Sequence, residues 1–202
     1  MTRPSVPKPE RGAWQPVVAA SQGSLRVETR PVPEPGPGQV LIAVEAAGVN
    51  RADVLQAEGR YPPPAGVTDI LGLECAGRIA ALGDGVTGWH TGQKVCALLD
   101  GGGYAAFAVA DAELCLPMPE EMSFEAAACL PEALATICSN VSAADLPHGG
   151  AVLMHGGAGG LGHLAIQMFK QHFHAFVFTT CRGGKRGFCL QAGADVAIDY
   201  EE

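Results

Sequence analysis

Two different patterns of hydrophobic and polar residues divide the chain near Ser123. From residue 13 to about residue 117, short apolar runs are separated by Gly and Pro, which is typical of β-strands joined by turns. The segments expected to be strands are residues 25–28, 40–44, 78–82, 95–99 and 105–109. Many short strands at this spacing predict a compact domain resembling a β-barrel.

Beyond Ser123 the pattern becomes that of helices and then of alternating strands and helices. Ser123 is expected to cap a helix over residues 126–130, and Pro131 to restart a second helix over residues 132–139. Strands are expected at residues 151–154, 176–179 and 196–198, and helices at residues 161–170 and 185–191. Such alternation predicts parallel βαβ units, so the fold class is α/β.

These patterns divide the chain into four parts. The expected parts are a disordered tail at residues 1–13, a β domain at 14–122, connecting helices at 123–146 and an α/β domain at 147–202. The tail is rich in Pro and polar residues, which is why no packed structure is expected there.

A glycine-rich loop joins the first strand of the α/β domain to the helix after it. Its residues, which fit the pattern GxGxxG, are Gly157, Ala158, Gly159, Gly160, Leu161 and Gly162. Such glycines allow a tight turn and let backbone N–H groups approach a pyrophosphate at the start of a helix. A chance match is the alternative in a chain with 27 glycines. The strand before the loop and the helix after it favour dinucleotide binding.

The charges that follow the loop favour NADPH over NADH. No Asp or Glu occurs between Asp145 and Asp195, whereas a site for NAD usually places an acidic residue about 20 positions after the loop. The cations in the same stretch are Lys170, Arg182, Lys185 and Arg186. They would attract the 2′-phosphate of NADPH, the alternative being a solvated basic turn.

Composition and charge exclude several classes of protein. With 13 basic and 21 acidic residues the net charge is −8, so neither a nucleic acid nor an anionic membrane is an expected partner. No stretch is long and apolar enough to span a bilayer, and no secretory signal is visible. The seven cysteines form no CxxC pair, which argues against a zinc ribbon and a disulfide scaffold. Their odd number and the missing signal indicate reduced thiols and a cytoplasmic location.

Four further motifs resemble a known family. They are residues 47–53 (AGVNRAD), 59–64 (GRYPPP), 70–77 (ILGLECAG) and 130–133 (LPEA) with Thr136. With His155 and the glycine loop, they resemble the zinc-free quinone oxidoreductase branch of the medium-chain dehydrogenase/reductase superfamily, in particular the p53-inducible quinone reductase type. The resemblance covers residues 13–202. It implies a GroES-like β-barrel domain, then a Rossmann domain, which is a doubly wound parallel sheet, with NADPH in the cleft between them.

The resemblance also implies roles for single residues. Asn50 would lie near the nicotinamide, Tyr61 would close over cofactor and substrate, and Thr136 would lie on the cofactor side. Lys185, with Arg182 beside it, would bind the 2′-phosphate, and Tyr200 would lie near the adenosine.

Each of these assignments has a plain structural alternative. Asn50 could be a turn residue, Tyr61 could pack against the prolines that follow it, and Thr136 could bond its own helix. Tyr200 could belong to a frayed end, and the two glycines before Lys185 could shift its assignment by one position.

Zinc is not expected. By the resemblance, zinc-dependent relatives have Cys where this chain has Asn50 and His where it has Leu73. Neither residue is a zinc ligand, since zinc prefers thiolate, imidazole and carboxylate.

The resemblance implies NADPH-dependent reduction of a quinone or another activated carbonyl or alkene, with a proton from Tyr61 or water. An enoyl-thioester or alkenal reductase is the nearest alternative among enzymes. A rival of another class is a non-catalytic fragment that binds nucleotide or a partner chain.

A full Rossmann sheet has the strand order 3-2-1-4-5-6, and only three strands are expected here. The chain is therefore expected to be truncated and to build only the 3-2-1 half, with impaired activity. The apolar strand 151–154 would then form a sheet edge that favours self-association or a homo-oligomer.

Overall fold

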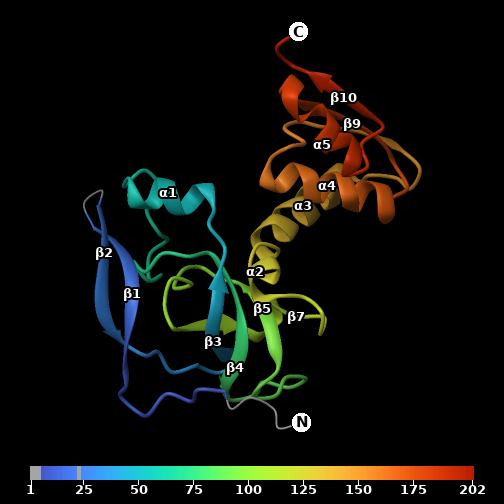
Figure 1. Ribbon diagram of the computed structural model, residues 1–202. Helices are drawn as coiled ribbons and strands as arrows, with labels where there is room; N and C mark the ends of the chain where they lie inside the picture. Colours follow the sequence, from blue (N-terminus) through green and yellow to red (C-terminus); the bar gives the residue numbers. More distant parts are fainter. Residues whose placement is uncertain (1–5, 22–23) are drawn as a thin grey trace. The chain divides into compact units, whose positions relative to one another are not determined.

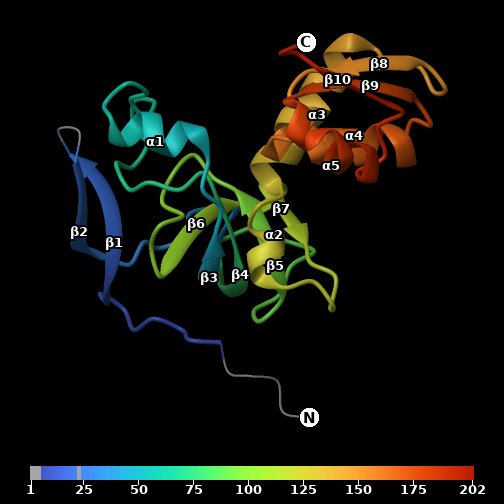
Figure 2. The same ribbon diagram turned by 45° about the horizontal axis from the view of Figure 1, so that its top comes forward.

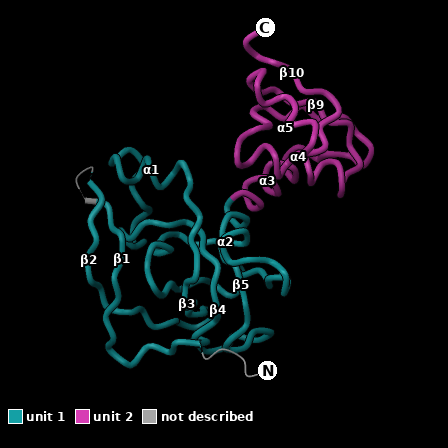
Figure 3. The backbone as a smooth tube through the Cα atoms, in the orientation of Figure 1, with its two compact units in different colours: residues 1–132 teal, residues 133–202 magenta. Residues whose placement is uncertain are grey.

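The computed structural model describes residues 6–21 and 24–202, which form two compact units (Figure 3). Unit 1 comprises residues 1–132 and unit 2 residues 133–202, so the division falls inside helix α3 (Pro131–Ala144). The first five residues of the expected tail lie outside the described residues. Val6, which follows them, packs against a small apolar cluster that includes Leu41 and Ala43.

Unit 1 is built on an antiparallel sheet with the order β6-β3-β4-β5-β7 (Figure 1). These strands are β3 (Gln39–Ala47), β4 (Glu74–Leu82), β5 (Lys94–Leu98), β6 (Phe107–Asp111) and β7 (Cys115–Pro117). Val40, Ile42, Ile79 and Val95 are fully buried at its centre because adjacent strands point their apolar side chains to the same core.

A separate hairpin of β1 (Trp14–Ser21) and β2 (Ser24–Pro31) lies beside this sheet. Isolated bridges join Val17 to Ala105 and Ala19 to Ile70, and so tie the hairpin to two loops of unit 1. The β domain of short strands expected from the sequence is thus confirmed, and its strands pair antiparallel. In the described residues the main sheet is curled, and its ladder ends at β6 and β7 without closing.

Helices in unit 1 come at the ends of strands. Helix α1 (Arg51–Ala57) follows β3, and the sequence analysis, which expected only strands there, did not predict it. A short 3-10 helix, η1 (Ala112–Leu114), follows β6. Helix α2 (Phe124–Ala127) follows β7. The N–H of Ala126 donates to Ser123 Oγ at 3.2 Å, so the expected cap at Ser123 is confirmed.

Unit 2 contains the alternating strands and helices expected from the sequence. Its elements after α3 are β8 (Ala151–Met154), α4 (Gly160–Gln171), β9 (Phe176–Cys181), η2 (Gly183–Lys185), α5 (Arg186–Gln191) and β10 (Val196–Asp199). All strand pairs are parallel, in the order β10-β9-β8. This confirms the 3-2-1 order, with β8 at one edge.

The two faces of this sheet differ sharply (Figure 2). Helices pack on one face, where Ile166 and Val177 are completely buried. The residues of the other face include Leu153, Phe176 and Ile198, which are 53%, 47% and 44% exposed. Within the described ranges no helix is long and apolar enough to cross a membrane.

Candidate functional site

In unit 1, the site is centred on the junction between β3 and α1. Asn50 precedes the first residue of α1, and its backbone N–H donates to the Asp53 carboxylate at 2.7 Å. This bond satisfies a donor at the start of the helix, as in a capping box. Asp53 is only 3% exposed and also accepts from the Gly72 N–H at 3.2 Å and the Tyr104 hydroxyl at 3.0 Å.

A second buried carboxylate holds the Asn50 side chain. Glu74, at the start of β4 and 2% exposed, accepts from Asn50 Nδ2 at 2.8 Å and from the Glu132 N–H at 2.9 Å. It therefore fixes the amide of Asn50 and the first turn of α3 at the same time. Gly48 leaves room for it, because a Cβ there would collide with the Glu74 carboxylate and lie 2.6 Å from the Ala128 carbonyl oxygen.

Burial sets the protonation of this network. Desolvation raises the pKa of Glu74, the hydrogen bonds from Glu132 and Asn50 lower it, and the nearby acidic groups raise it further. Desolvation also raises the pKa of Tyr104, and the Asp53 carboxylate beside its hydroxyl adds to that shift. Tyr104 therefore stays a neutral donor at ordinary pH.

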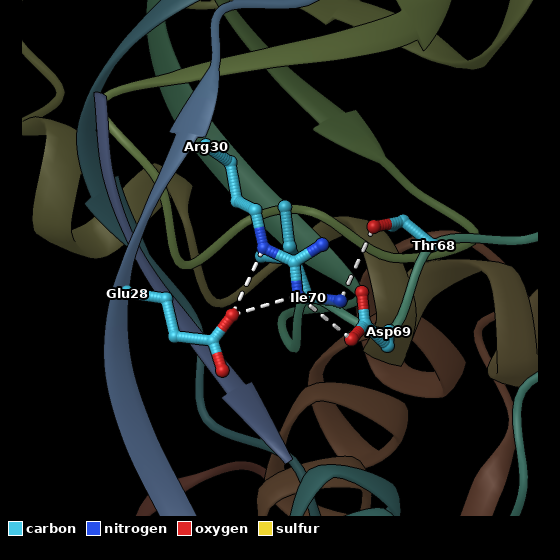
Figure 4. Close-up of polar contacts among 5 residues, drawn as sticks. All are labelled: Glu28, Arg30, Thr68, Asp69 and Ile70. Atoms are coloured by element: carbon cyan, nitrogen blue, oxygen red, sulfur yellow. Dashed lines mark hydrogen bonds and ion pairs between the residues drawn. The ribbon is translucent and has the colours of Figure 1, made fainter. Parts of the chain in front are cut away.

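Tyr61 makes no hydrogen bond to this network in the described residues. Tyr61 lies on the loop between α1 and β4 and is 51% exposed, and among the described residues its hydroxyl has no hydrogen-bond partner. The far end of the same loop is anchored to β2, since Arg30 bonds both Asp69 at 3.2 Å and Glu28 at 2.7 Å (Figure 4). The loop is thus fixed at residues 68–70.

In unit 2, the glycine loop lies between β8 and α4. Two of its glycines are needed for close packing, because a Cβ at Gly157 would lie 2.9 Å from Ile166 Cδ1 and one at Gly162 would lie 2.6 Å from Gly157 Cα. Gly159 caps α4 without a side chain. The N–H groups of the first three helical residues, 160–162, precede the first bond inside the helix and point out of its end.

Thr136 and the end of β8 share a cavity. A hollow of about 460 Å³ within unit 2 has Thr136, Leu153 and His155 in its wall. The carbonyl oxygen of Thr136 accepts a hydrogen bond from Asn140 Nδ2 at 2.8 Å. His155 Nδ1 lies 3.2 Å from Thr180 Oγ1.

The cations expected to bind a ribose phosphate lie on η2 and at its edges. Arg182 follows β9, and its Nε donates to the Tyr200 hydroxyl at 3.1 Å and lies 3.6 Å from the Glu201 carboxylate. Lys185 and Arg186 are exposed. Sequence position alone did not reveal that two acidic residues, Asp199 beside Gly183 and Glu201 beside Arg182, fold back to this end of the sheet.

Three residues of the unit 1 network were not named as functional by the sequence analysis: Asp53, Glu74 and Tyr104. A signal for Glu74 was present, since a single carboxylate at the start of an apolar run is uncommon unless it has partners. Throughout the described residues, no three His, Cys, Asp or Glu side chains are grouped so that they could hold a metal ion.

Comparison with known proteins agrees with this division of the chain. Residues 36–120 match the family model of the alcohol dehydrogenase GroES-like domain. Unit 1 therefore contains a GroES-like domain of the alcohol dehydrogenase type. Among curated proteins it is 41% identical over 167 residues to the pikromycin polyketide synthase component PikAII of Streptomyces venezuelae, a match that covers 82% of this chain and 4% of that protein.

Three solved structures are similar to nearly the whole chain. The quinone oxidoreductase from Coxiella burnetii is 31% identical with a TM-score of 0.83, over 94% of this chain and 63% of that one. The CurK enoyl reductase is 30% identical with a TM-score of 0.81, over 93% and 60%. A mycobacterial protein complexed with NADPH is 33% identical with a TM-score of 0.78, over 93% and 59%. The chain thus spans about three fifths of these structures.

Proposed function

We propose that this chain binds NADPH and takes part in the zinc-free reduction of quinones, as in the p53-inducible quinone reductase branch. The observation that carries the proposal is the glycine loop, where close packing at Gly157 and Gly162 leaves no room for side chains and the first N–H groups of α4 point outward. Backbone N–H groups at the start of a helix suit a pyrophosphate. The similar mycobacterial structure contains NADPH, which supports this cofactor.

Arg182, Lys185 and Tyr200 are proposed to bind the adenosine end. Arg182 keeps several donors after its bond to Tyr200, and Lys185 is exposed beside it. Both cations would attract a 2′-phosphate, at roughly 2–4 kcal/mol for two charge-assisted bonds. Thr136 is proposed to lie on the cofactor side because it shares its cavity with His155, which directly precedes the loop.

NADPH, when bound, would supply a hydride, and the residues of unit 1 would orient the acceptor. Asn50 is suited to hold a carbonyl group because Glu74 fixes its side chain. Tyr61 is half exposed, and its hydroxyl is proposed to give a proton to the reduced acceptor and to regain one from water. Zinc independence is part of the proposal, since Asn50 and Leu73 are not zinc ligands.

Tyr61→Phe tests the substrate side of this proposal. The change should lower quinone turnover about tenfold or more, in the range of a lost proton donor, while the dissociation constant for NADPH stays within twofold. Steady-state assays and an NADPH titration measure the two quantities. Weaker NADPH binding with unchanged turnover would assign Tyr61 to the cofactor instead.

Calorimetric titration with NADPH and NADH tests the cofactor side. We expect NADPH to bind about tenfold or more tightly, and Lys185→Gln to remove most of that preference. Arg60→Gln, which changes an exposed cation in unit 1, is the matched control and should leave the preference intact. Equal dissociation constants for the two cofactors would contradict the proposal.

An enoyl-thioester reductase is the second candidate, favoured by the similarity to the CurK enoyl reductase and to a polyketide synthase. The two activities are separated by following NADPH oxidation with a set of quinones and a set of enoyl thioesters. A chain that binds NADPH and reduces neither set would be a nucleotide-binding fragment without activity of its own.

A further inference from the structure

Two cations face each other at the end of the β4–β5 ladder of the unit 1 sheet. Arg78 on β4 and Lys94 on β5 are direct partners in the antiparallel register. Like charges in this position repel each other and destabilise a sheet. The Lys94 side chain is only 20% exposed, so water screens the repulsion poorly. A negative charge nearby would relieve this repulsion.

The protein groups around the pair supply little negative charge. Arg78 and Lys94 both lie against the ring of Phe124, at 5.5 and 5.7 Å from its centroid, and the ring has no net charge. Arg78 Nη1 donates to the Gly92 carbonyl at 3.2 Å, and Lys94 Nζ donates to the Glu120 carbonyl at 3.0 Å. Both acceptors are neutral.

The only carboxylate within ion-pair distance of either cation, among the described residues, is that of Glu120. It lies 3.6 Å from Lys94 Nζ, and its side chain is 91% exposed. Such an exposed pair contributes little, and the side chain is free to turn into solvent. Lys94 therefore has one loosely held carboxylate, and Arg78 has no carboxylate within ion-pair distance among the described residues, in a chain whose net charge is −8.

A cavity opens at this pair. It has a volume of about 460 Å³, and Arg78, Lys94, His90 and Gln93 are in its wall together with Glu120. Gln93 accepts from the His90 backbone N–H at 3.3 Å through its oxygen, which directs the loop at residues 90–93 around the cavity. Guanidinium, ammonium, imidazole and amide groups all donate hydrogen bonds.

The cavity is separate from the site at Asn50. Glu74 and Arg78 are four residues apart on β4, which is about 13 Å along a strand. Ala76 lies between them and packs against Ala127 and Ala128 at the end of α2. A ligand at Arg78 would therefore be separated from Asn50 by packed side chains.

We propose that this cavity binds a phosphate group, either inorganic phosphate or the phosphate of a small phosphomonoester. A guanidinium and an ammonium on neighbouring strands suit a doubly charged tetrahedral anion, since arginine binds two of its oxygens and lysine a third. The site is independent of the proposed NADPH site, which lies in unit 2.

Calorimetric titration with inorganic phosphate at constant ionic strength tests the proposal. Lys94→Gln and Arg78→Gln should each weaken binding about tenfold or more, and Lys94→Arg should restore most of it. Arg26→Gln removes an exposed cation on β2 and should change the affinity less than twofold. Lys185→Gln controls for phosphate bound at the proposed NADPH site in unit 2. This variant should bind phosphate as the parent does.

Glu120→Gln is expected to strengthen phosphate binding, a result that a folding defect would not produce. Among the described residues, Glu120 is the one carboxylate within ion-pair distance of Lys94, so without its charge phosphate should bind severalfold more tightly. Amide shifts in nuclear magnetic resonance spectra should move at His90 and Gln93 on titration. Phosphate binding that is undetectable, or that is the same in the Lys94, Arg26 and Glu120 variants, would overturn the proposal. Phosphomonoesters that compete with inorganic phosphate would identify the larger ligand.

Discussion

The two candidate half-sites are built by opposite means. In unit 1 the site consists of side chains, and each one is held by others: Glu74 holds Asn50, and Asp53 holds Tyr104. In unit 2 the glycine loop exposes backbone N–H groups and works only because side chains are absent at Gly157 and Gly162. The first half-site is therefore sensitive to removal of atoms, and the second to addition of atoms.

Buried polar groups follow the same rule in both units, but one sheet face of unit 2 stays apolar and exposed. In the part of the chain that the structure describes, every buried side-chain nitrogen and oxygen has a partner, and the carboxylates of unit 1 depend on this. The sheet of unit 2 instead leaves Leu153, Phe176 and Ile198 exposed on one face. Both units thus satisfy their buried polar groups, and in unit 2 the exposed residues gather on one sheet face that another chain or segment could cover.

Removal of Glu74 should have the largest effect on stability. Glu74→Ala leaves Asn50 Nδ2 and the Glu132 N–H without their acceptor, which should lower the free energy of unfolding by about 2–4 kcal/mol. Urea denaturation measures it. The control is Glu45→Ala, an exposed carboxylate on β3, for which we expect a change of less than about 0.5 kcal/mol. Equal losses in both variants would mean that the network is not stabilising.

The second-largest loss of stability is expected when one methyl group is added to the glycine loop. Gly162→Ala places a Cβ against the backbone of Gly157, which cannot move aside, so a loss of about 1–3 kcal/mol and weaker NADPH binding are expected. Gly160→Ala is the matched control in the same turn, because its Cβ would meet nothing within 4 Å. If both variants bind NADPH as the parent does, close packing at residue 162 is dispensable.

The protonation of Glu74 should give a smaller, pH-dependent difference. Its pKa is raised in the folded state, so the folded protein binds the proton more tightly than the unfolded chain. The stability that this provides is present below the unfolded pKa and is lost as the pH rises through the folded pKa. Glu74→Gln stays neutral, so its free energy of unfolding relative to the parent should rise between pH 4.5 and neutrality. A difference that is constant over this range would contradict the assignment.

Changes on the exposed face of the unit 2 sheet should have the smallest effect on folding. Phe176→Ser should alter the free energy of unfolding by less than about 0.5 kcal/mol. It should reduce self-association, which is proposed to occur at this face and at the β8 edge, as measured by light scattering. Val27→Lys changes an exposed apolar residue of unit 1 and serves as the control. Association that falls equally in both variants would place the contact elsewhere.

Much of the fold could be read from local sequence patterns. The strand at Ala151–Met154 has its expected bounds, and Ser123 caps α2 through the bond that its residue type suggests. The parallel order of β8, β9 and β10 follows from alternating strands and helices, because short connections favour neighbouring strands. Helix α1 was not predicted because it is a short segment between Gly- and Pro-rich turns, where the periodicity of apolar residues is weak evidence for a helix.

The candidate site also has one part that a local sequence pattern reveals and another part that depends on long-range contacts. The glycine loop is a local motif, so its position was evident from the order of Gly157 to Gly162 between a strand and a helix. Asn50 was selected through a family resemblance, and the sequence contained no indication that Glu74, 24 positions later, would bond it. The folding back of Asp199 and Glu201 towards Arg182 was equally hidden, since it depends on where β10 ends relative to β9.

The sequence by itself determined the elements and the loop chemistry of this protein, because capping, turns and periodicity act over a few neighbouring residues. Only the tertiary structure decided which charged side chains become buried and which partners they meet. Antiparallel pairing brings Arg78 opposite Lys94, and the start of β4 carries Glu74 to the first turn of α3. Such long-range pairs arise from strand register and packing, and no local pattern records them.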